Sequence, residues 1–289
     1  MKQPSTGHLL ELEDVNFRYP DGSVGLDSCS LPILRGSRTA LLGTNGAGKT
    51  TLFLHLNGIL KPQSGSLSYS GAPLDYSRKG LHKLRSRIGL VFQNPDSQLF
   101  SASVREDVSF GPMNLGLDIG VVRERVEKAL QAVRMVENAD KPVHNLSYGQ
   151  KKRVCIAGAL AMNPEMLILD EPMAGLDLSM QNELIQILNK LHADGMTIII
   201  ATHDIDFAYG WADEAIVLQA GRVLAQGVPA EVLQQEVVQE ELGGAPLVAE
   251  LCRALALTGT AVYANGYLPR SGTELVRALQ NQYRQENKP

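Results

Sequence analysis

A glycine-rich loop constrains the fold of this chain more than any other feature of its sequence. Residues 43–50 read GTNGAGKT and match the pattern G-x-x-x-x-G-K-[ST]. The apolar run RTALLG leads into the loop as a predicted strand, and residues 49–60 follow it as a predicted helix that ends near Gly58 and Pro62. In this context consecutive backbone N–H groups point inward, and the helix N-terminus adds partial positive charge. The loop therefore predicts a phosphate-binding site in an α/β fold.

The residue types in this loop suit the phosphate chain of a nucleotide. Lys49 supplies a point charge for the β- and γ-phosphates, and the Thr50 hydroxyl is a ligand for Mg²⁺. Glycine permits the tight turn of the backbone. The predicted nucleotide-binding residues are Gly43, Thr44, Asn45, Gly46, Ala47, Gly48, Lys49, Thr50 and Thr51.

Composition narrows the class of protein. The 289 residues are 44% hydrophobic with a net charge of -4, so a large core can form and a nucleic-acid partner is disfavoured. The cysteines Cys29, Cys155 and Cys252 stand far apart, which fits a reducing cytoplasm rather than a disulfide frame or a zinc site. We expect no signal peptide, and no apolar run approaches the roughly 20 residues that span a bilayer. Any membrane role is expected to come through a partner.

Two other apolar runs predict strands that are buried on both faces. MLILDE, residues 166–171, and MTIIIATHD, residues 196–204, show no alternation, which is typical of a parallel sheet covered by helices. Residues 8–20 alternate instead and predict N-terminal β-strands. Residues 214–227 predict a hairpin that turns at Ala220-Gly221.

Polar residues follow these strands at the edge of the sheet where the phosphate loop also emerges. Asp170 suits Mg²⁺, directly or through water, and Glu171 can polarise the attacking water. The alternative for such an acid pair is a solvated turn. His203 is predicted to contact the γ-phosphate, and the alternative is a structural histidine. Gln93, after the strand SRIGLVFQ, could sense both Mg²⁺ and the water.

Tyr19 in FRYP is the candidate for holding the base. It is either an ordinary core or edge tyrosine or an aromatic platform for adenine. The chain lacks the guanine-reading pattern N-K-x-D, which favours adenine.

The stretch LSYGQKKR, residues 146–153, has no acid or histidine beside its serine. We expect LSYGQ to form a loop and a helix to begin at KKR. The three cations Lys151, Lys152 and Arg153 are expected to assist an incoming phosphate or to pair with nearby acids.

The chain is expected to divide at residue 240. Composition shifts near Gly243-Gly244, and two helices are predicted beyond it, the second with capping-box spacing at Ser271 and Glu274. Residues 241–289 are therefore predicted to be a small helical extension.

Six motifs in order resemble those of the ATP-binding-cassette ATPases over roughly residues 8–235: the phosphate loop, VFQNP, LSYGQ, LILDE, AGLD and ATHD. The resemblance implies a RecA-like core, an N-terminal antiparallel β-subdomain and a helical lobe at about 94–162. It identifies residues 43–50 as Walker A, Asp170 and Glu171 as the Walker B aspartate and catalytic glutamate, and residues 174–177 as the D-loop with Asp177. It also implies ATP and Mg²⁺ as cofactors, with Thr50, Gln93 and Asp170 at the metal, and Tyr19 at adenine.

The same resemblance implies a head-to-tail dimer of two copies. The signature residues of one copy would face the ATP of the other: Ser147, Tyr148, Gly149 and Gln150. The usual motif has a second glycine where this chain has Tyr148, so that side chain must point away from the nucleotide. An integral membrane subunit would dock a helix near residues 94–135, which implies a peripheral position on the cytoplasmic face of the cell membrane.

The closer resemblance is to ATPases of energy-coupling-factor importers, above all to cobalt-transport members, on VFQNPDSQLFSASVREDVSFGPMNLGL, LSYGQKKRVCIAGALAM and DEPMAGLD. Nickel or a vitamin stays open as the cargo. Two rivals differ in class: a soluble cassette ATPase that acts as a mechanical clamp, and a phosphate-loop kinase. The clamp is disfavoured by the acidic pI and by the absence of coiled-coil insertions. The kinase is disfavoured because a kinase does not require the LSYGQ motif.

Overall fold

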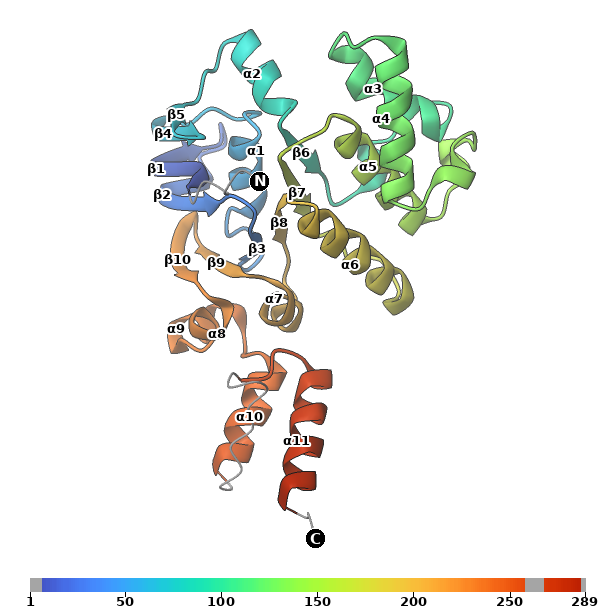
Figure 1. The fold of residues 1–289 in the computed structure, drawn as a ribbon. Helices are drawn as coiled ribbons and strands as arrows, with labels where there is room; N and C mark the ends of the chain where they lie inside the picture. Colours follow the sequence, from blue (N-terminus) through green and yellow to red (C-terminus); the bar gives the residue numbers. More distant parts are fainter. Residues whose placement is uncertain (1–6, 258–267, 287–289) are drawn as a thin grey trace.

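A six-stranded, mostly parallel sheet forms the centre of the computed structural model, which describes residues 7–257 and 268–286 (Figure 1). The strand order is β10-β9-β3-β8-β7-β6, and only the hairpin pair β9 and β10 is antiparallel. The strands are β3 (Arg38–Leu42), β6 (Ile88–Val91), β7 (Met166–Asp170), β8 (Thr197–Ala201), β9 (Glu214–Gln219) and β10 (Arg222–Gly227).

Both faces of this sheet are buried, as the unbroken apolar runs predict. Along β7, Met166 and Ile168 belong to one apolar cluster, whereas Leu167 and Leu169 belong to another. All five residues of β7 and all five of β8 are buried. Because successive side chains of a strand point to opposite faces, each strand contributes to two cores.

A second, antiparallel sheet covers one side of the first. Its strand order is β2-β1-β4-β5, and β1 pairs with both β2 and β4. The predicted alternation holds for only part of β1: Leu10 and Leu12 are buried with the half-buried Glu11 between them, but Leu9 is buried beside Leu10. The strands are β1 (His8–Arg18), β2 (Val24–Leu34), β4 (Ser64–Tyr69) and β5 (Ala72–Pro73).

Three helices pack against one another beside the parallel sheet and form the helical lobe (Figure 1). Val108, Val126 and Val154 from these three helices join the larger apolar cluster. The lobe helices are α3 (Val104–Asn114), α4 (Ile119–Ala132) and α5 (Tyr148–Ala161), with short 3₁₀ turns at Pro95–Ser97, Val136–Asn138 and Val143–Asn145.

The remaining helices cover the sheet and extend the chain. Helix α9 contains residue 240, so the expected division of the chain, which stays a prediction, falls inside a helix. The helices are α1 (Lys49–Leu56), α2 (Arg78–Arg85), α6 (Leu178–Ala193), α7 (Ile205–Trp211), α8 (Pro229–Val232), α9 (Glu236–Leu242), α10 (Leu247–Leu257) and α11 (Gly272–Glu286).

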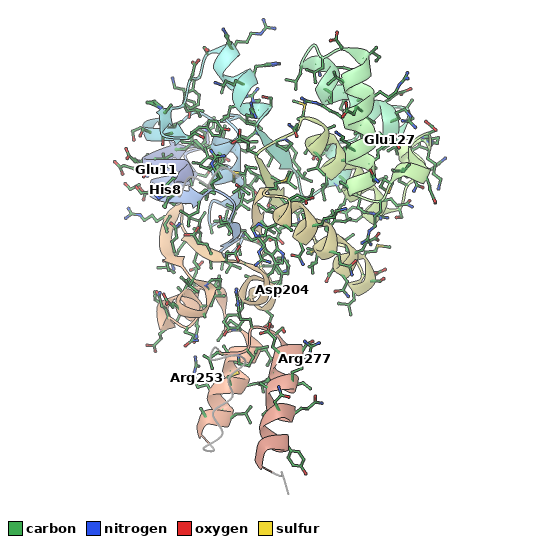
Figure 2. All side chains as sticks on the ribbon, in the orientation of Figure 1. His8, Glu11, Glu127, Asp204, Arg253 and Arg277 are labelled. Atoms are coloured by element: carbon green, nitrogen blue, oxygen red, sulfur yellow. The ribbon has the colours of Figure 1, made fainter. Side chains whose placement is uncertain are left out.

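Helices α10 and α11 pack through Val248, Cys252 and Leu275, while the exposed Arg253 and Arg277 mark these two helices in Figure 2. The predicted cap of α11 is present, since the Glu274 amide donates to Ser271 Oγ at 3.2 Å. None of the helices in the described ranges is long and apolar enough to cross a bilayer.

The start of α5 differs from the expectation. Helix α5 begins at Tyr148 rather than at the KKR run, so only Leu146 and Ser147 of LSYGQ lie before the helix. Ser147 Oγ accepts from the Gln150 amide, and Gln150 Oε1 accepts from the Ser147 amide at 3.0 Å. This capping box satisfies two helix N–H groups and extends the helix backward by a turn.

Candidate functional site

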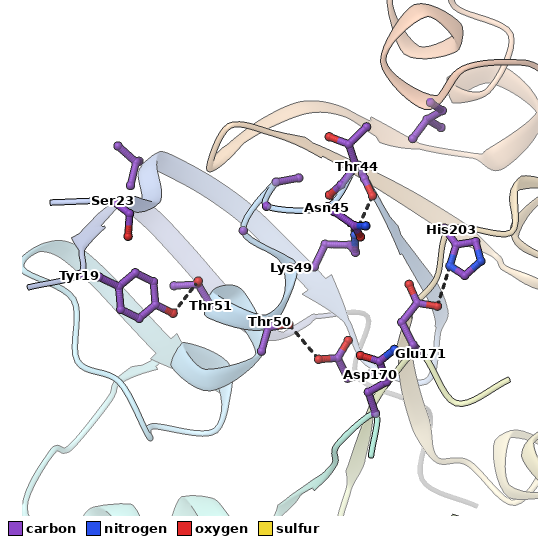
Figure 3. Close-up of a pocket in the computed structure, with 17 residues that line it drawn as sticks. Tyr19, Ser23, Thr44, Asn45, Lys49, Thr50, Thr51, Asp170, Glu171 and His203 are labelled. Atoms are coloured by element: carbon purple, nitrogen blue, oxygen red, sulfur yellow. Dashed lines mark hydrogen bonds and ion pairs between the residues drawn. The ribbon is translucent and has the colours of Figure 1, made fainter. Parts of the chain in front are cut away.

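A cavity of about 770 Å³ gathers most of the predicted site residues at the carboxyl ends of the parallel strands (Figure 3). Such a volume is large enough for a nucleotide. The lining residues are Tyr19, Ser23, Val24, the loop residues Gly43, Thr44, Asn45, Gly46, Ala47, Gly48, Lys49, Thr50 and Thr51, and Gln93, Asp170, Glu171, His203 and Leu242.

The phosphate loop is held in shape by backbone contacts that side chains would prevent. Gly48 has φ +105°, and a Cβ there would lie 2.5 Å from the Gly25 carbonyl oxygen. Helix α1 begins directly after it at Lys49. The Lys49 ammonium donates to the Gly43 carbonyl at 2.6 Å, which places its charge inside the loop. The loop N–H groups, the helix end and this cation together form an anion site.

Oxygen donors meet at one corner of the cavity. The Thr50 hydroxyl donates to Asp170 Oδ2 at 2.9 Å, and the Gln93 side chain lines the same cavity. Asp170 is only 8% exposed, and this burial raises the pKa of its carboxyl group, while the Thr50 hydrogen bond and the Lys49 charge oppose the rise. Hydroxyl, amide and carboxylate oxygens are the donors that Mg²⁺ prefers, so this set fits that ion.

No group of three or more histidine, cysteine or acidic residues suited to a metal occurs among residues 7–257 and 268–286. A metal at the Thr50 corner would therefore depend on nucleotide oxygens for further ligands.

The turn after β7 positions Glu171. Its backbone has φ +45°, a left-handed conformation that is uncommon for a residue with a side chain. Glu171 Oε2 lies 3.1 Å from Nδ1 of His203, which follows β8. The Glu171 side chain is 14% exposed and that of His203 is 79% exposed. A partly enclosed carboxylate with an exposed hydrogen-bond partner suits a group that takes a proton from water.

Tyr19 lies at the far end of the cavity from Glu171, as Figure 3 shows. Its hydroxyl is 2.9 Å from Thr51 Oγ1, and Phe17 packs edge-on against the ring at 5.1 Å. The Thr51 hydroxyl is thus engaged with Tyr19. These contacts fix the ring at the cavity wall, where a base could stack on it.

The signature residues do not reach this cavity within one chain. Ser147, Gly149 and Gln150 line a separate and smaller cavity next to α6. Asp177 caps α6, and its carboxylate accepts from the Met180 amide at 2.8 Å. Within one chain, therefore, the signature residues and the phosphate loop line different cavities.

Tyr148 is turned toward its own subunit. Its hydroxyl is 3.5 Å from the Gln93 carbonyl oxygen, and a Cβ at Gly175 would lie 2.9 Å from the tyrosine ring. The ring therefore covers the D-loop glycine. The expectation that it points away from a bound nucleotide stays a prediction.

The three cations after the signature have different environments. Lys151 pairs with Asp96 at 2.7 Å, and Arg153 pairs with Glu183 at 2.7 Å, as expected for cations that find acids. The expectation is wrong for Lys152, which is 3% exposed and donates to backbone carbonyls instead. The sequence does not distinguish a buried lysine from an exposed one in such a basic run. Only the packing of α5 shows that Lys152 is buried.

Contacts from α9 were also missed in the sequence. Glu241 accepts from the Thr44 hydroxyl at 2.7 Å and from the Gln219 amide at 2.6 Å, and Leu242 lines the cavity. No local motif marks these residues, because 197 positions separate Thr44 from Glu241.

Several known proteins are similar to this chain. A family model described as ABC transporter matches residues 26–174. An energy-coupling factor transporter ATP-binding protein, EcfA of Methanocaldococcus jannaschii, is 47% identical over 249 residues, which are 86% of this chain and 89% of that protein. The cobalt import ATP-binding protein CbiO of Rhodobacter capsulatus is 48% identical over 249 residues, again 86% and 89% of the two chains.

Solved structures show the same fold. The structure of cbiO1 from Clostridium perfringens, described as part of the ABC transporter complex cbiONQ, matches with a TM-score of 0.74 and 47% identity over 87% of this chain and 99% of that one. A dimeric ATP-binding cassette in a post-hydrolysis state, bound to ADP and Pi, matches with a TM-score of 0.69 and 27% identity over 76% of this chain and 98% of that one.

Proposed function

The chain belongs to the ABC transporter family, in its group of energy-coupling factor ATP-binding subunits, and we propose that it is the ATPase of a cobalt-ion importer. It binds ATP and is an ATPase, as members of this group are. ATP hydrolysis is supported most by the meeting of the phosphate loop, Asp170, Glu171 and His203 in one cavity, and cobalt as cargo by the 48% identity with CbiO.

The cavity suggests how ATP is held. The loop N–H groups and Lys49 would bind the phosphates, and Tyr19 would stack on adenine. Thr50, Asp170 and Gln93 would hold Mg²⁺. When bound, the ion supplies positive charge that offsets the negative charge of the transferred phosphoryl group.

Glu171 is the proposed general base. Its carboxylate would accept a proton from the water that attacks the γ-phosphate. The hydrogen bond with His203 at 3.1 Å would orient the carboxylate, and the left-handed backbone of Glu171 aims it into the cavity.

A second copy of the chain would complete each site. The signature residues lie in a cavity of their own, and the chain contains both an intact phosphate loop and an intact Glu171. Two copies related by a twofold axis therefore provide two equivalent sites. ATP would join the two copies, and hydrolysis would release them.

A groove between α2 and α3 is the proposed docking place for a membrane subunit. Apolar side chains line it, among them Phe110, Leu115 and Met162. Phe110 is 49% exposed, and Phe100, 66% exposed, packs edge-on against it at 4.8 Å. An exposed aromatic pair beside an apolar groove is typical of a surface that binds a partner. The α3 wall falls within the stretch 94–135, and α2 lies outside it. This docking would hold the ATPase at the cytoplasmic face of the membrane.

The cargo is tested by transport. The protein would be reconstituted in vesicles with the membrane subunits that co-purify with it, and uptake of labelled Co²⁺, Ni²⁺ and a vitamin would be compared with ATP inside or outside. We expect ATP-dependent uptake of Co²⁺. If only Ni²⁺ or only a vitamin is taken up, that substrate and not Co²⁺ is the cargo. If no membrane protein co-purifies with the chain, the soluble clamp is favoured instead.

A variant of the groove can be tested in the same co-purification and transport assays. Phe110→Asp should abolish co-purification and uptake while the ATPase activity of the isolated chain is kept, because Phe110 lies outside the nucleotide cavity.

A further inference from the structure

Lys152 is a buried cation whose hydrogen bonds all go to one turn. Its ammonium group donates to the carbonyl oxygens of Glu171 at 3.1 Å, Pro172 at 2.9 Å and Ala174 at 2.8 Å. An ammonium group has three N–H donors, so all of them are used. The side chain is 3% exposed. Burial of a charge is costly unless hydrogen bonds offset the cost, and the three carbonyl oxygens supply these bonds.

The turn that Lys152 holds is the one that aims Glu171. Glu171 is in a left-handed conformation, which is strained for a residue with a side chain and persists only where the surroundings enforce it. The Lys152 ammonium is bonded to the carbonyl of this strained residue itself and to two carbonyls that follow it. Gln181 from α6 holds the next part of the turn through the carbonyls of Met173 and Leu176.

Lys152 also belongs to the signature end of α5. It lies one helical turn after Tyr148, whose ring lies 5.3 Å from the Lys152 ammonium. The same ring lies against Gly175, directly after the carbonyls that Lys152 binds. Tyr148 therefore shields the ammonium and closes the contact between α5 and the turn, which gives a physical reason for a bulky residue at this position of the signature.

We propose that Lys152 is a positioning residue for Glu171, and that it connects the signature end of α5 to the catalytic carboxylate of the same subunit. The inference rests on the proposed role of Glu171 as the base. In the proposed dimer the signature end of α5 contacts the partner's ATP, whereas Glu171 acts on the ATP of its own subunit. Lys152 thus provides a direct path of contacts from one nucleotide to the other.

A double-mutant cycle separates this role from a merely structural one. Lys152→Met keeps the long stem and removes the three donors, and it is combined with Glu171→Gln. We expect Lys152→Met alone to lower kcat at least tenfold with the KM for ATP within twofold. In single-turnover measurements on the Glu171→Gln background, the same change should lower the rate less than twofold, because the base through which Lys152 acts is already absent.

Two further variants control the cycle. Lys128→Met removes an exposed cation of α4 that pairs with Glu124, and it should change kcat less than twofold in both backgrounds. Lys152→Gln keeps an amide that can donate to two carbonyls, and its kcat should lie between those of the wild type and Lys152→Met. It also takes the place of Lys152→Met in the cycle if thermal melting shows that the latter does not fold.

Different failures are distinguishable. Equal losses of rate in both backgrounds, or a raised KM with normal kcat, would overturn the positioning role. Normal kcat in Lys152→Met beside an inactive Glu171→Gln would reject the inference alone. Near-normal turnover in Glu171→Gln would reject the proposed base and, with it, the inference.

Discussion

Nδ1 of His203 lies 3.1 Å from Oε2 of Glu171, and the two residues follow the adjacent parallel strands β8 and β7. The pairing of these strands fixes the two backbones relative to each other, so the hydrogen bond depends little on loop conformation. The His203 side chain is largely exposed to the cavity and solvent, whereas that of Glu171 is largely enclosed. One residue is therefore suited to sense the nucleotide and the other to perform the chemistry.

Glu171→Gln should lower the steady-state rate of ATP hydrolysis by about 10²–10⁴-fold, the contribution typical of a general base. The amide keeps a similar size and can still bond to His203, so ATP affinity should stay within about threefold of the wild type. Phosphate release and equilibrium ATP binding measure the two effects. Glu240→Gln, which changes an exposed acid on α9, is the matched control. Turnover close to that of the control would show that Glu171 is not the base.

Ser147→Ala should prevent ATP-driven dimerisation while leaving ATP binding by the monomer nearly unchanged. The same change removes the cap of α5 and should lower the free energy of unfolding by about 1 kcal/mol. Ser147→Thr keeps the hydroxyl and is the control for dimerisation. Sedimentation with and without ATP, in the Glu171→Gln background to prevent hydrolysis, gives the dimer fraction. A dimer fraction equal to that of Ser147→Thr would contradict the signature contact in trans.

Much of the site could be predicted from the sequence because its residues are local to strand ends. The phosphate loop follows β3, Asp170 ends β7, and His203 follows β8, so a short apolar run beside a polar residue was enough to place each of them. The parallel sheet then brings the strand ends together without further information. The start of α5 could also have been predicted, since Ser147 and Gln150 have capping-box spacing.

The rest depended on packing between distant segments. Lys152 lies in a basic run that is typical of an exposed surface. It is buried only because α5 packs against the turn after β7, where Ala174 lies 22 residues further along the chain. The direction of the Tyr148 ring follows from the same packing. Glu241 binds Thr44, which lies 197 residues before it in the chain. A sequence pattern within one helix or strand does not predict such long-range contacts.

Tyr148→Phe should keep kcat within twofold of the wild type. The phenylalanine ring still covers Gly175 and the Lys152 ammonium, and only the 3.5 Å contact with the Gln93 carbonyl is lost. Tyr148→Ala should lower kcat by about threefold or more, the equivalent of one cation–π contact. Steady-state ATPase assays of the two variants decide this. Equal activity of both would mean that the ring has no part in the arrangement.

Glu241→Gln should strengthen ATP binding a few-fold at low ionic strength. Glu241 places a negative charge beside the phosphate loop through its bond to Thr44, and the amide can keep a bond to that hydroxyl without the charge. Salt screens the repulsion, so the difference should shrink at high ionic strength. Calorimetric titration with ATP at both ionic strengths tests this, with Glu240→Gln as the control for loss of one charge. An effect that is equal in the two variants would show that general charge, and not this contact, is responsible.

Lys152 should make the stability of the chain depend on pH in the alkaline range. Burial lowers the pKa of Lys152 to about 8, from about 10.5 for an exposed lysine, although the nearby charge of Glu171 opposes the shift. Between these two values the unfolded chain binds more protons than the folded chain, so the cost of the buried charge, full below pH 8, is relieved as pH rises. Relative to Lys152→Met, the free energy of unfolding of the wild type should therefore increase from about pH 8 to about pH 10.5. Urea unfolding of both proteins across this range measures the difference, and a difference that is constant or falls with pH would show that the three carbonyls keep Lys152 protonated throughout.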